Sequence, residues 1–331
     1  MAQARGINAV MALGDESTYG TAASGNYLKI YFASETVGAQ RNMIDSNTLG
    51  GTRVRSAPIA GNWDVSGQIV TEVNAESMLY LLKHGVESAP NKVGAAAPFT
   101  MTYQPDTLHT GFTLELDYGS DISGAGRVRQ LVGCRMAGFD FNFPSEGIPT
   151  ATWRVVGAAP TVPALSALTD SGLDDWGNYP FSAFQATVNE GGSALAIATS
   201  IQFSVDNGIE PVYVIGGSGK RASAPEGFVS VTGTLEAIFD SATLLNKAIN
   251  STETSLEVVL TRGAGTGATV GTEKLTITLE ELKYSPAFPT VEGPAGILVR
   301  LPFTCYKGTG TESAFKCVAL VPQDVTTIAA T

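Results

Sequence analysis

The feature of this sequence that most restricts its fold is an internal repeat. Residues 49–55 and 215–221 share an aliphatic residue, a Gly-Gly pair, a hydroxyl side chain and a final Arg. The two segments lie 166 positions apart, and the same offset continues without a gap to about residue 82. A repeat of this length indicates two copies of one structural unit within the chain.

A second repeated block shows how the two copies differ. Residues 146–155 match 292–301 at the smaller offset of 146, so the first copy contains about 20 additional residues between the two blocks. The stretch 87–111 is rich in Ala, Pro and Thr and is the natural place for them, as an inserted loop. We therefore expect two domains, 1–165 and 166–331, with a Pro-containing linker at the boundary.

Within the repeat, polar and apolar residues alternate as they do in a strand with one wet face. In the first copy Val65 and Ile69 alternate with polar residues, and in the second copy Val231 and Leu235 do the same. A short helix follows each strand, with N-caps expected at Asn74 and Asp240. We predict a mainly β fold made of two tandem copies of a β-sandwich or open barrel, each with one short α-helix. Further strands are expected over 112–118, 136–143, 150–156, 256–262, 275–284 and 297–306.

Charge and cysteine content exclude several classes of protein. The net charge of −11 is the opposite of the basic surface with which proteins grip nucleic acid. The sequence contains no continuous apolar run long enough to cross a bilayer, so no membrane-spanning helix is expected. Cys134, Cys305 and Cys317 are too few for a disulfide framework, and we expect buried, reduced thiols.

No motif in the chain predicts catalysis. The two histidines, His84 and His109, do not belong to a zinc-binding or hydrolase motif. The glycine-rich segments 216–220 and 263–268 lack the residues or the helix context of phosphate and dinucleotide loops. The acidic pairs at 174–175 and 280–281 are typical of a solvated surface. We therefore expect no enzyme activity, no cofactor and no metal.

The order and spacing of several short motifs resemble the tail tube (major tail) proteins of long-tailed bacteriophages, in the form with a duplicated tube domain. The likeness is carried by residues 14–21, 27–28, 34–37, 42–46 and 49–53, and in the second half by 205–210 and 231–235. The resemblance implies a structural virion protein of siphophages whose rings stack into a tube that conducts DNA during ejection. Since single-domain members form rings of six, three duplicated chains would form a homotrimeric, pseudo-sixfold ring.

The resemblance also implies partners and a location. The expected partners are other copies of the chain, the tape-measure protein, the tail terminator and the baseplate or tail-tip proteins, with transient passage of DNA and no membrane. The expected location is the virion tail, assembled in the host cytoplasm. The wet faces of the two repeated strands could line the lumen, and the polar segments before them could reach the next ring. The candidate lumen residues are Asp64, Ser66, Gln68, Glu72, Ser230, Thr232, Thr234 and Glu236. The candidate ring-stacking residues are Arg41, Asn42, Arg53, Arg55, Lys220 and Arg221.

Two alternatives remain open at this point. Another phage tail component of the same fold, such as a terminator or the inner tube of a contractile system, would have the same strand pattern. A surface carbohydrate-binding β-sandwich would need exposed aromatic residues in a row, whereas Trp63, Trp153 and Trp176 are scattered. The first two lie on apolar strand faces, which favours packing in the core.

Overall fold

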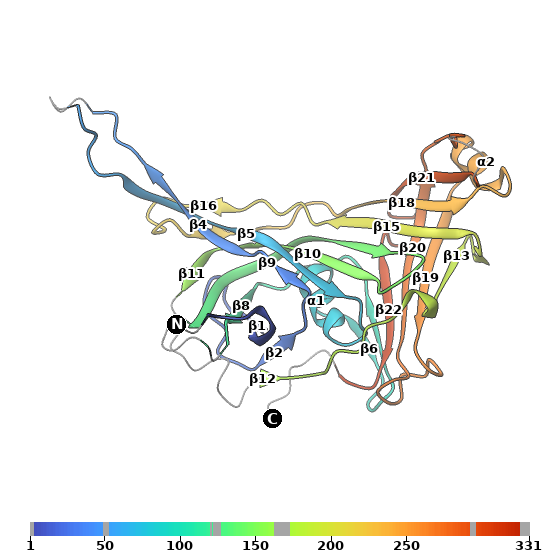
Figure 1. Cartoon of the computed structure of the whole chain (residues 1–331), viewed down its shortest axis with the longest axis horizontal. Coiled ribbons are helices and arrows are strands. Elements are labelled where there is room, and N and C mark those ends of the chain that lie inside the picture. The colour runs from blue at the N-terminus through green and yellow to red at the C-terminus, as the bar shows by residue number, and fades with distance from the viewer. Residues whose placement is uncertain are drawn as a thin grey trace.

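The computed structural model describes residues 3–48, 53–119, 121, 127–161, 173–291 and 296–324. Within these ranges the chain is mainly β with two short α-helices, as the sequence predicts (Figure 1). The strands of the first half are β1 (Val10–Asp15), β2 (Tyr27–Ile30), β3 (Ser34–Glu35), β4 (Gly38–Ile44), β5 (Ile59–Glu72), β6 (Asn91–Val93), β7 (Phe99–Tyr103), β8 (Phe112–Asp117), β9 (Val128–Phe143), β10 (Thr150–Gly157) and β11 (Ala159–Thr161). Those of the second half are β12 (Leu173–Asp174), β13 (Ala186–Glu190), β14 (Ser193–Ala194), β15 (Ala198–Asp206), β16 (Val212–Tyr213), β17 (Arg221–Ser223), β18 (Ser230–Ile238), β19 (Thr254–Thr261), β20 (Lys274–Tyr284), β21 (Leu298–Cys305) and β22 (Lys316–Val321).

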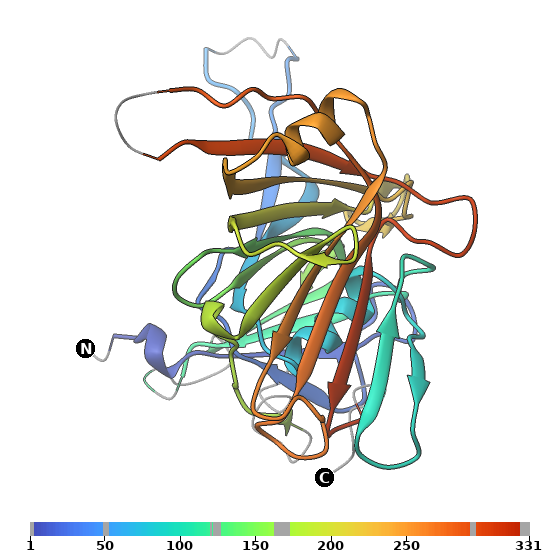
Figure 2. The ribbon, with the colours of Figure 1, turned by 90° about the vertical axis from the view of Figure 1, so that its right-hand side faces the viewer.

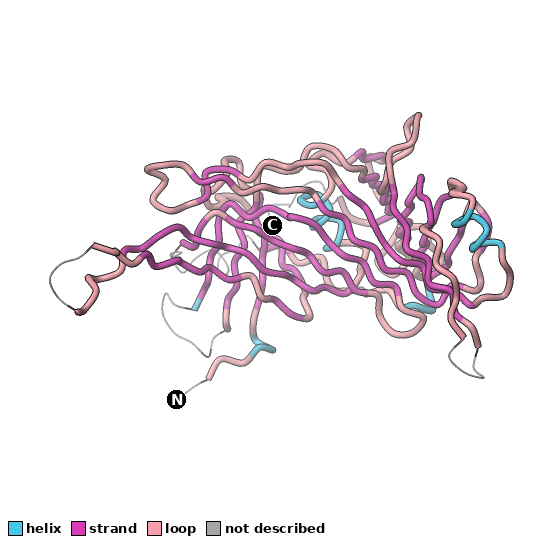
Figure 3. Tube along the Cα trace, turned by 90° about the horizontal axis from the view of Figure 1, so that it is seen from above, coloured by secondary structure: helices cyan, strands magenta, loops and turns pink. Residues whose placement is uncertain are grey.

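One continuous antiparallel sheet crosses both halves of the chain. Its strands lie in the order β4-β5-β10-β9-β15-β18-β21, and β20 pairs with the end of β21. The halves join where β9 pairs with β15, with Phe141 opposite Phe203. Seen from above, these strands run side by side along the length of the molecule (Figure 3). Each half therefore supplies four strands to a single surface.

Two further groups of strands cover the inner side of this sheet. The first extends from β9 through β8 and β1 to β2. The second contains β13, β19, β20 and β22, and the β6–β7 hairpin pairs with β22 (Figure 2). The first half thus adds its hairpin to the sheet of the second half, and β12 of the second half pairs with β2 of the first. The two halves are interleaved.

An aromatic cluster fills the core below the junction of the halves. The rings of Phe141 and Phe203 lie 5.3 Å apart, and Phe139 lies 5.5 Å from Phe315. Trp153 is fully buried beside them, and its Nε1 donates to Thr71 Oγ1 at 2.9 Å. Because residues of both halves share this cluster, the halves bury much of their apolar surface against each other.

The elements recur at the two offsets found in the sequence. The starts of helix α1 (Ser77–Gly85) and helix α2 (Thr243–Ile249) are separated by the larger offset, whereas the starts of β9 and β20 are separated by the smaller one. This agreement supports the duplication, which stays a prediction, as does the division into two domains. The predicted boundary near residue 165, part of the linker, and the repeated residues 49–52 and 292–295 lie outside the described residues.

Several local predictions are wrong in detail. The segment predicted as an inserted loop contains the β6–β7 hairpin, because Phe99, Met101 and Tyr103 gain a pairing partner in β22. The helices begin after Glu76 and Ala242 rather than at the predicted N-caps. Asn74 still serves the first helix, since its Oδ1 accepts the backbone N–H of Met78 at 3.3 Å. Strand β9 begins well before the predicted start at residue 136 because its first half pairs with β8.

Candidate assembly surfaces

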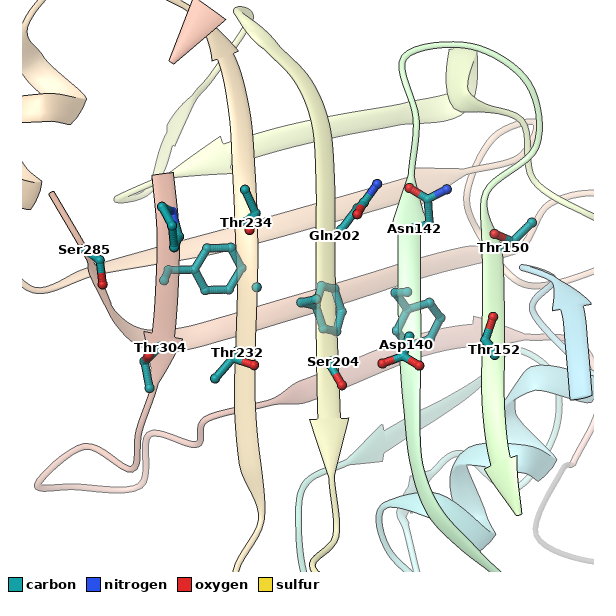
Figure 4. A pocket seen from close by; sticks show the side chains of 15 residues that line it. Asp140, Asn142, Thr150, Thr152, Gln202, Ser204, Thr232, Thr234, Ser285 and Thr304 are labelled. Atoms are coloured by element: carbon teal, nitrogen blue, oxygen red, sulfur yellow. The ribbon is translucent and has the colours of Figure 1, made fainter. Parts of the chain in front are cut away.

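The outer face of the central sheet is polar across several strands. In the pairing register Thr150 lies opposite Asn142, Asn142 opposite Gln202, and Gln202 opposite Thr234. Residues directly opposite each other in antiparallel strands project from the same face, so these side chains form a row across the sheet. A second row contains Thr152, Asp140, Ser204, Thr232 and Thr304. Figure 4 shows both rows on neighbouring strands, around a depression of about 710 Å³.

All eight candidate lumen residues lie on this face. On β5, Asp64, Ser66 and Gln68 are exposed and Glu72 is half-buried, opposite Thr150. The candidates on β18 alternate with buried neighbours; Ser230 and Thr232 are exposed, and Thr234 and Glu236 are half-buried. The sequence analysis did not assign the polar residues that β10, β9 and β15 add. The alternation of polar and apolar residues along these three strands could have identified them. The residues that were missed are Thr150, Thr152, Asp140, Asn142, Gln202 and Ser204.

The charges of this face are mixed. Arg154 reaches across β9 and pairs with Asp140 at 2.6 Å and with Asp206 at 3.4 Å. Arg300 pairs with Glu236 at 3.3 Å. Carboxylates outnumber the cations, but several carry an ionic partner, so the face is less acidic than the sequence alone suggested. The carboxylates are Asp64, Glu72, Asp140, Asp206 and Glu236; the cations on the same face are Arg154, Arg300 and Lys283.

A long β-hairpin forms an arm that projects from the body of the molecule. It consists of β4, the start of β5 and the described residues 45–48 and 53–58 between them, and it points away from the body of the molecule in Figure 1. Four apolar side chains of the arm are exposed, with exposed fractions between 53% and 81%: Met43, Ile44, Val54 and Ile59. Exposed apolar residues gathered on one projecting element are typical of a contact surface for another protein.

Four of the candidate stacking residues lie on this arm. Arg41, Asn42, Arg53 and Arg55 are all exposed. The guanidinium of Arg41 lies over the ring of Trp63, 5.2 Å from its centroid, and its Nε donates to the Gly61 carbonyl at 3.0 Å. The segment predicted as a polar loop is therefore a strand pair over much of its length.

Residues 208–229 of the second half, which include most of the segment equivalent to the arm, have a different conformation. This segment folds back along the base of the arm (Figure 1), where the carbonyl of Gly219 accepts the backbone N–H of Trp63 at 2.8 Å. Lys220 is exposed, but the side chain of Arg221 is only 8% exposed. Nη1 of Arg221 donates to the carbonyls of Val65 and Gly157 at 2.7 and 2.9 Å, and Nη2 pairs with the Asp64 carboxylate. The contacts of Arg221 are therefore within its own chain, and its predicted stacking role has no exposed side chain to support it.

The other motifs of the sequence have structural roles in the described parts of the chain. Residues 216–220 form the turn between β16 and β17, and 263–268 lie in the connection between β19 and β20, so neither opens a helix. Asp175 pairs with Lys29, and Glu280 pairs with Lys316. All three cysteines are buried and free. No described helix is long and apolar enough to cross a membrane.

A mainly β chain with an extended polar sheet face and an arm that exposes apolar residues has the surfaces of a structural protein that assembles with others. The family model for phage tail tube proteins matches residues 6–305, and the chain belongs to this family. It is accordingly a structural component of the virion tail, in a family whose members self-assemble into a tube. A comparison with curated proteins found no match.

Proposed function

We propose that three copies of this chain close a ring with pseudo-sixfold symmetry and that the rings stack into a hollow tube that conducts DNA. The observation that carries the proposal is the continuous sheet, in which each half supplies four strands. Three chains then contribute as many strands to a closed barrel as six single-domain subunits would. Closure of a sheet into a barrel removes its free edges. Exposed edges would otherwise pair non-specifically with the strands of other chains.

The two ends of the sheet are the proposed ring contacts. Among the described pairings, β4 pairs with β5 alone, and β21 contacts β20 only over residues 303–305. The outer edge of β4 in one copy can therefore add to the β21–β20 end of the next copy. This contact joins two different surfaces of the chain. It closes a ring only when the rotation from one subunit to the next divides a full turn into a whole number of steps.

The polar outer face is the proposed lining of the lumen. Its hydroxyl and amide side chains are uncharged and form hydrogen bonds as water does. Its excess of carboxylates repels the phosphates of DNA. Two of the cations on this face are engaged by carboxylates, Arg154 by Asp140 and Asp206, and Arg300 by Glu236. DNA could therefore slide through such a lumen without binding tightly.

The arm is the proposed contact between rings. Its exposed apolar side chains would be buried against the body of a subunit in the next ring, which would stabilise the stack. The tape-measure protein, the terminator and the baseplate or tail-tip proteins are the proposed partners at the inside and the ends of the tube. We propose that assembly takes place in the host cytoplasm and that the tube belongs to the tail of a siphophage.

Electron microscopy of the purified protein, dilute and after concentration, tests this proposal. We expect rings with three chains each, and hollow tubes built from them. Rings with six chains would contradict the pseudo-sixfold arrangement. A ring that caps tubes but never extends them would favour the terminator, and binding to a contractile sheath would favour the inner-tube alternative. Monomers that bind glycans would favour the carbohydrate-binding alternative.

A further inference from the structure

The two histidines of the chain lie side by side, although they belong to different elements of the fold. His84 is in the last turn of α1, His109 lies between β7 and β8, and Asp15 lies beside them at the end of β1. The imidazole centroids of the histidines are 4.9 Å apart. One ligand atom from each of the three residues falls within 4.8 Å of the others, so two imidazoles and one carboxylate converge on a single point.

The ring of His84 is buried beside Asp15. Its side chain is 1% exposed, and Nε2 lies 3.1 Å from Oδ1 of Asp15. Neither ring nitrogen has a partner in hydrogen-bonding geometry among the described residues. A neutral imidazole carries a lone pair on one of its two nitrogens, which can then bind a metal ion. Buried polar atoms without partners cost free energy, which a ligand at this position would recover.

His109 is oriented toward the same point. Its Nδ1 lies 2.9 Å from the carbonyl oxygen of Gly111 and 3.4 Å from the backbone nitrogen of the same residue. The carbonyl can only accept, and this shorter contact favours the tautomer with the hydrogen on Nδ1. The lone pair is then on Nε2, 4.0 Å from Oδ2 of Asp15. A histidine that donates its second nitrogen to a backbone carbonyl is the usual arrangement of a metal ligand. The side chains of His109 and Asp15 are 19% and 33% exposed, so water can reach this side of the cluster.

We propose that Asp15, His84 and His109 bind one divalent transition-metal ion, for which Zn²⁺ fits best. Two imidazole nitrogens, one carboxylate oxygen and a water molecule form a common tetrahedral ligand set. Ligands about 2.0–2.2 Å from Zn²⁺ stand about 3.3 Å apart from one another, so small side-chain rotations would bring the three atoms into position. The ion would tie β1, α1 and the insertion together, contrary to the expectation of no metal from the sequence.

Lys83 competes with the ion for the carboxylate. Its Nζ lies 2.5 Å from Oδ2 of Asp15, while the hydroxyl of Tyr80 donates to Oδ1 at 2.6 Å. A cation that binds Oδ2 must displace this ammonium group and is repelled by its charge. Lys83 should therefore weaken metal binding in the wild-type protein. A variant that lacks this charge, such as Lys83→Met, should bind the metal more tightly.

The test is a Co²⁺ titration of untagged protein that has been dialysed against a chelator, in excess Mg²⁺ to occupy surface carboxylates. We expect one Co²⁺ per chain with a visible d–d spectrum, displacement by Zn²⁺, and shifted NMR signals from both imidazoles. His109→Asn should weaken binding at least about tenfold. Lys83→Met should tighten binding at least tenfold, whereas the charge-matched control Lys92→Met should not change it.

Circular dichroism and melting without metal establish that each variant is folded. If His109→Asn does not fold, the gain of affinity in Lys83→Met decides the question alone. Absence of a Co²⁺ spectrum in the wild-type protein would overturn the proposal. So would binding that His109→Asn leaves unchanged, or a Lys83→Met variant that binds no more tightly than the wild type.

Discussion

The buried side chain of Arg221 is one of several contacts that hold the folded-back segment 208–229. The hydroxyl of Tyr213 also donates to the Trp63 carbonyl, and Glu226 pairs with Arg135. The guanidinium of Arg221 connects this segment of the second half to the β5–β10 ladder of the first half, through the carbonyls of Val65 and Gly157. It also pairs with Asp64, whose side chain is 62% exposed. We predict that Arg221→Met releases the segment from the base of the arm.

The magnitude follows from these contacts. Hydrogen bonds to charged groups contribute about 1.5–3 kcal/mol each, and the bonds to the Val65 and Gly157 carbonyls are both buried. The pair with exposed Asp64 adds at most about 1 kcal/mol because water solvates that carboxylate once Arg221 is removed. We therefore expect Arg221→Met to lower the free energy of unfolding by about 3–7 kcal/mol. If only the segment detaches, the free energy of its local opening falls by the same amount. The amide hydrogens of residues 208–229 then exchange faster.

Lys220→Met is the matched control because it removes the same charge one position earlier from an exposed side chain. Chemical denaturation gives the free energy of unfolding, and hydrogen exchange with mass spectrometry localises any release. The control should stay within about 0.5 kcal/mol of the wild type. If Arg221→Met matches the control in both measurements, the assigned role of Arg221 is refuted.

Three further predictions concern assembly and pH. Reversing Asp64, Glu72 and Glu236 to Lys should leave tubes intact in electron micrographs but impair DNA ejection, since phosphates would bind the lining; normal infectivity would exclude the lumen assignment. Deleting part of residues 41–60, beyond the end of β4, should leave folded, soluble subunits that no longer form tubes, and tubes of normal length would disprove the stacking role. Burial and a neighbouring carboxyl group raise the pKa of Glu76 from 4.5 to about 8. The unfolded state then ionises first, so stability falls as pH rises between these values, and Glu76→Gln should flatten that part of a denaturation-against-pH curve.

Much of the fold could be predicted because its signals are local. The alternation of Val65, Ile69 and the polar residues between them predicts one buried and one wet strand face, as β5 shows. The change of repeat offset placed the extra residues of the first copy between α1 and β8. In the structure that connection spans 86–111, whereas the connection between α2 and β19 spans only 250–253.

What the sequence did not predict depends on contacts between distant segments. The β6–β7 hairpin was predicted as a loop because Gly, Ala and Pro residues surround it, although Thr alternates with apolar residues along β7. Its partner β22 lies near the other end of the chain. The cluster of Asp15, His84 and His109 was missed for the same reason, because no local spacing joins three residues on β1, α1 and a connecting segment. The same applies to Arg221, whose residue type and loop position favoured an exposed role until its partners were known.

The two repeated segments suggest how the proposed ring would depart from sixfold symmetry. At the repeat offset, the arm at 40–61 corresponds to 206–227, yet the first projects and the second folds back along its base. The folded-back copy supports the arm through Gly219 and Arg221, a contact that two identical segments could not both make. In the proposed ring of three chains, three projecting arms would alternate with three folded segments. Ring stacking would then follow threefold symmetry, even though the barrel is built from six similar units.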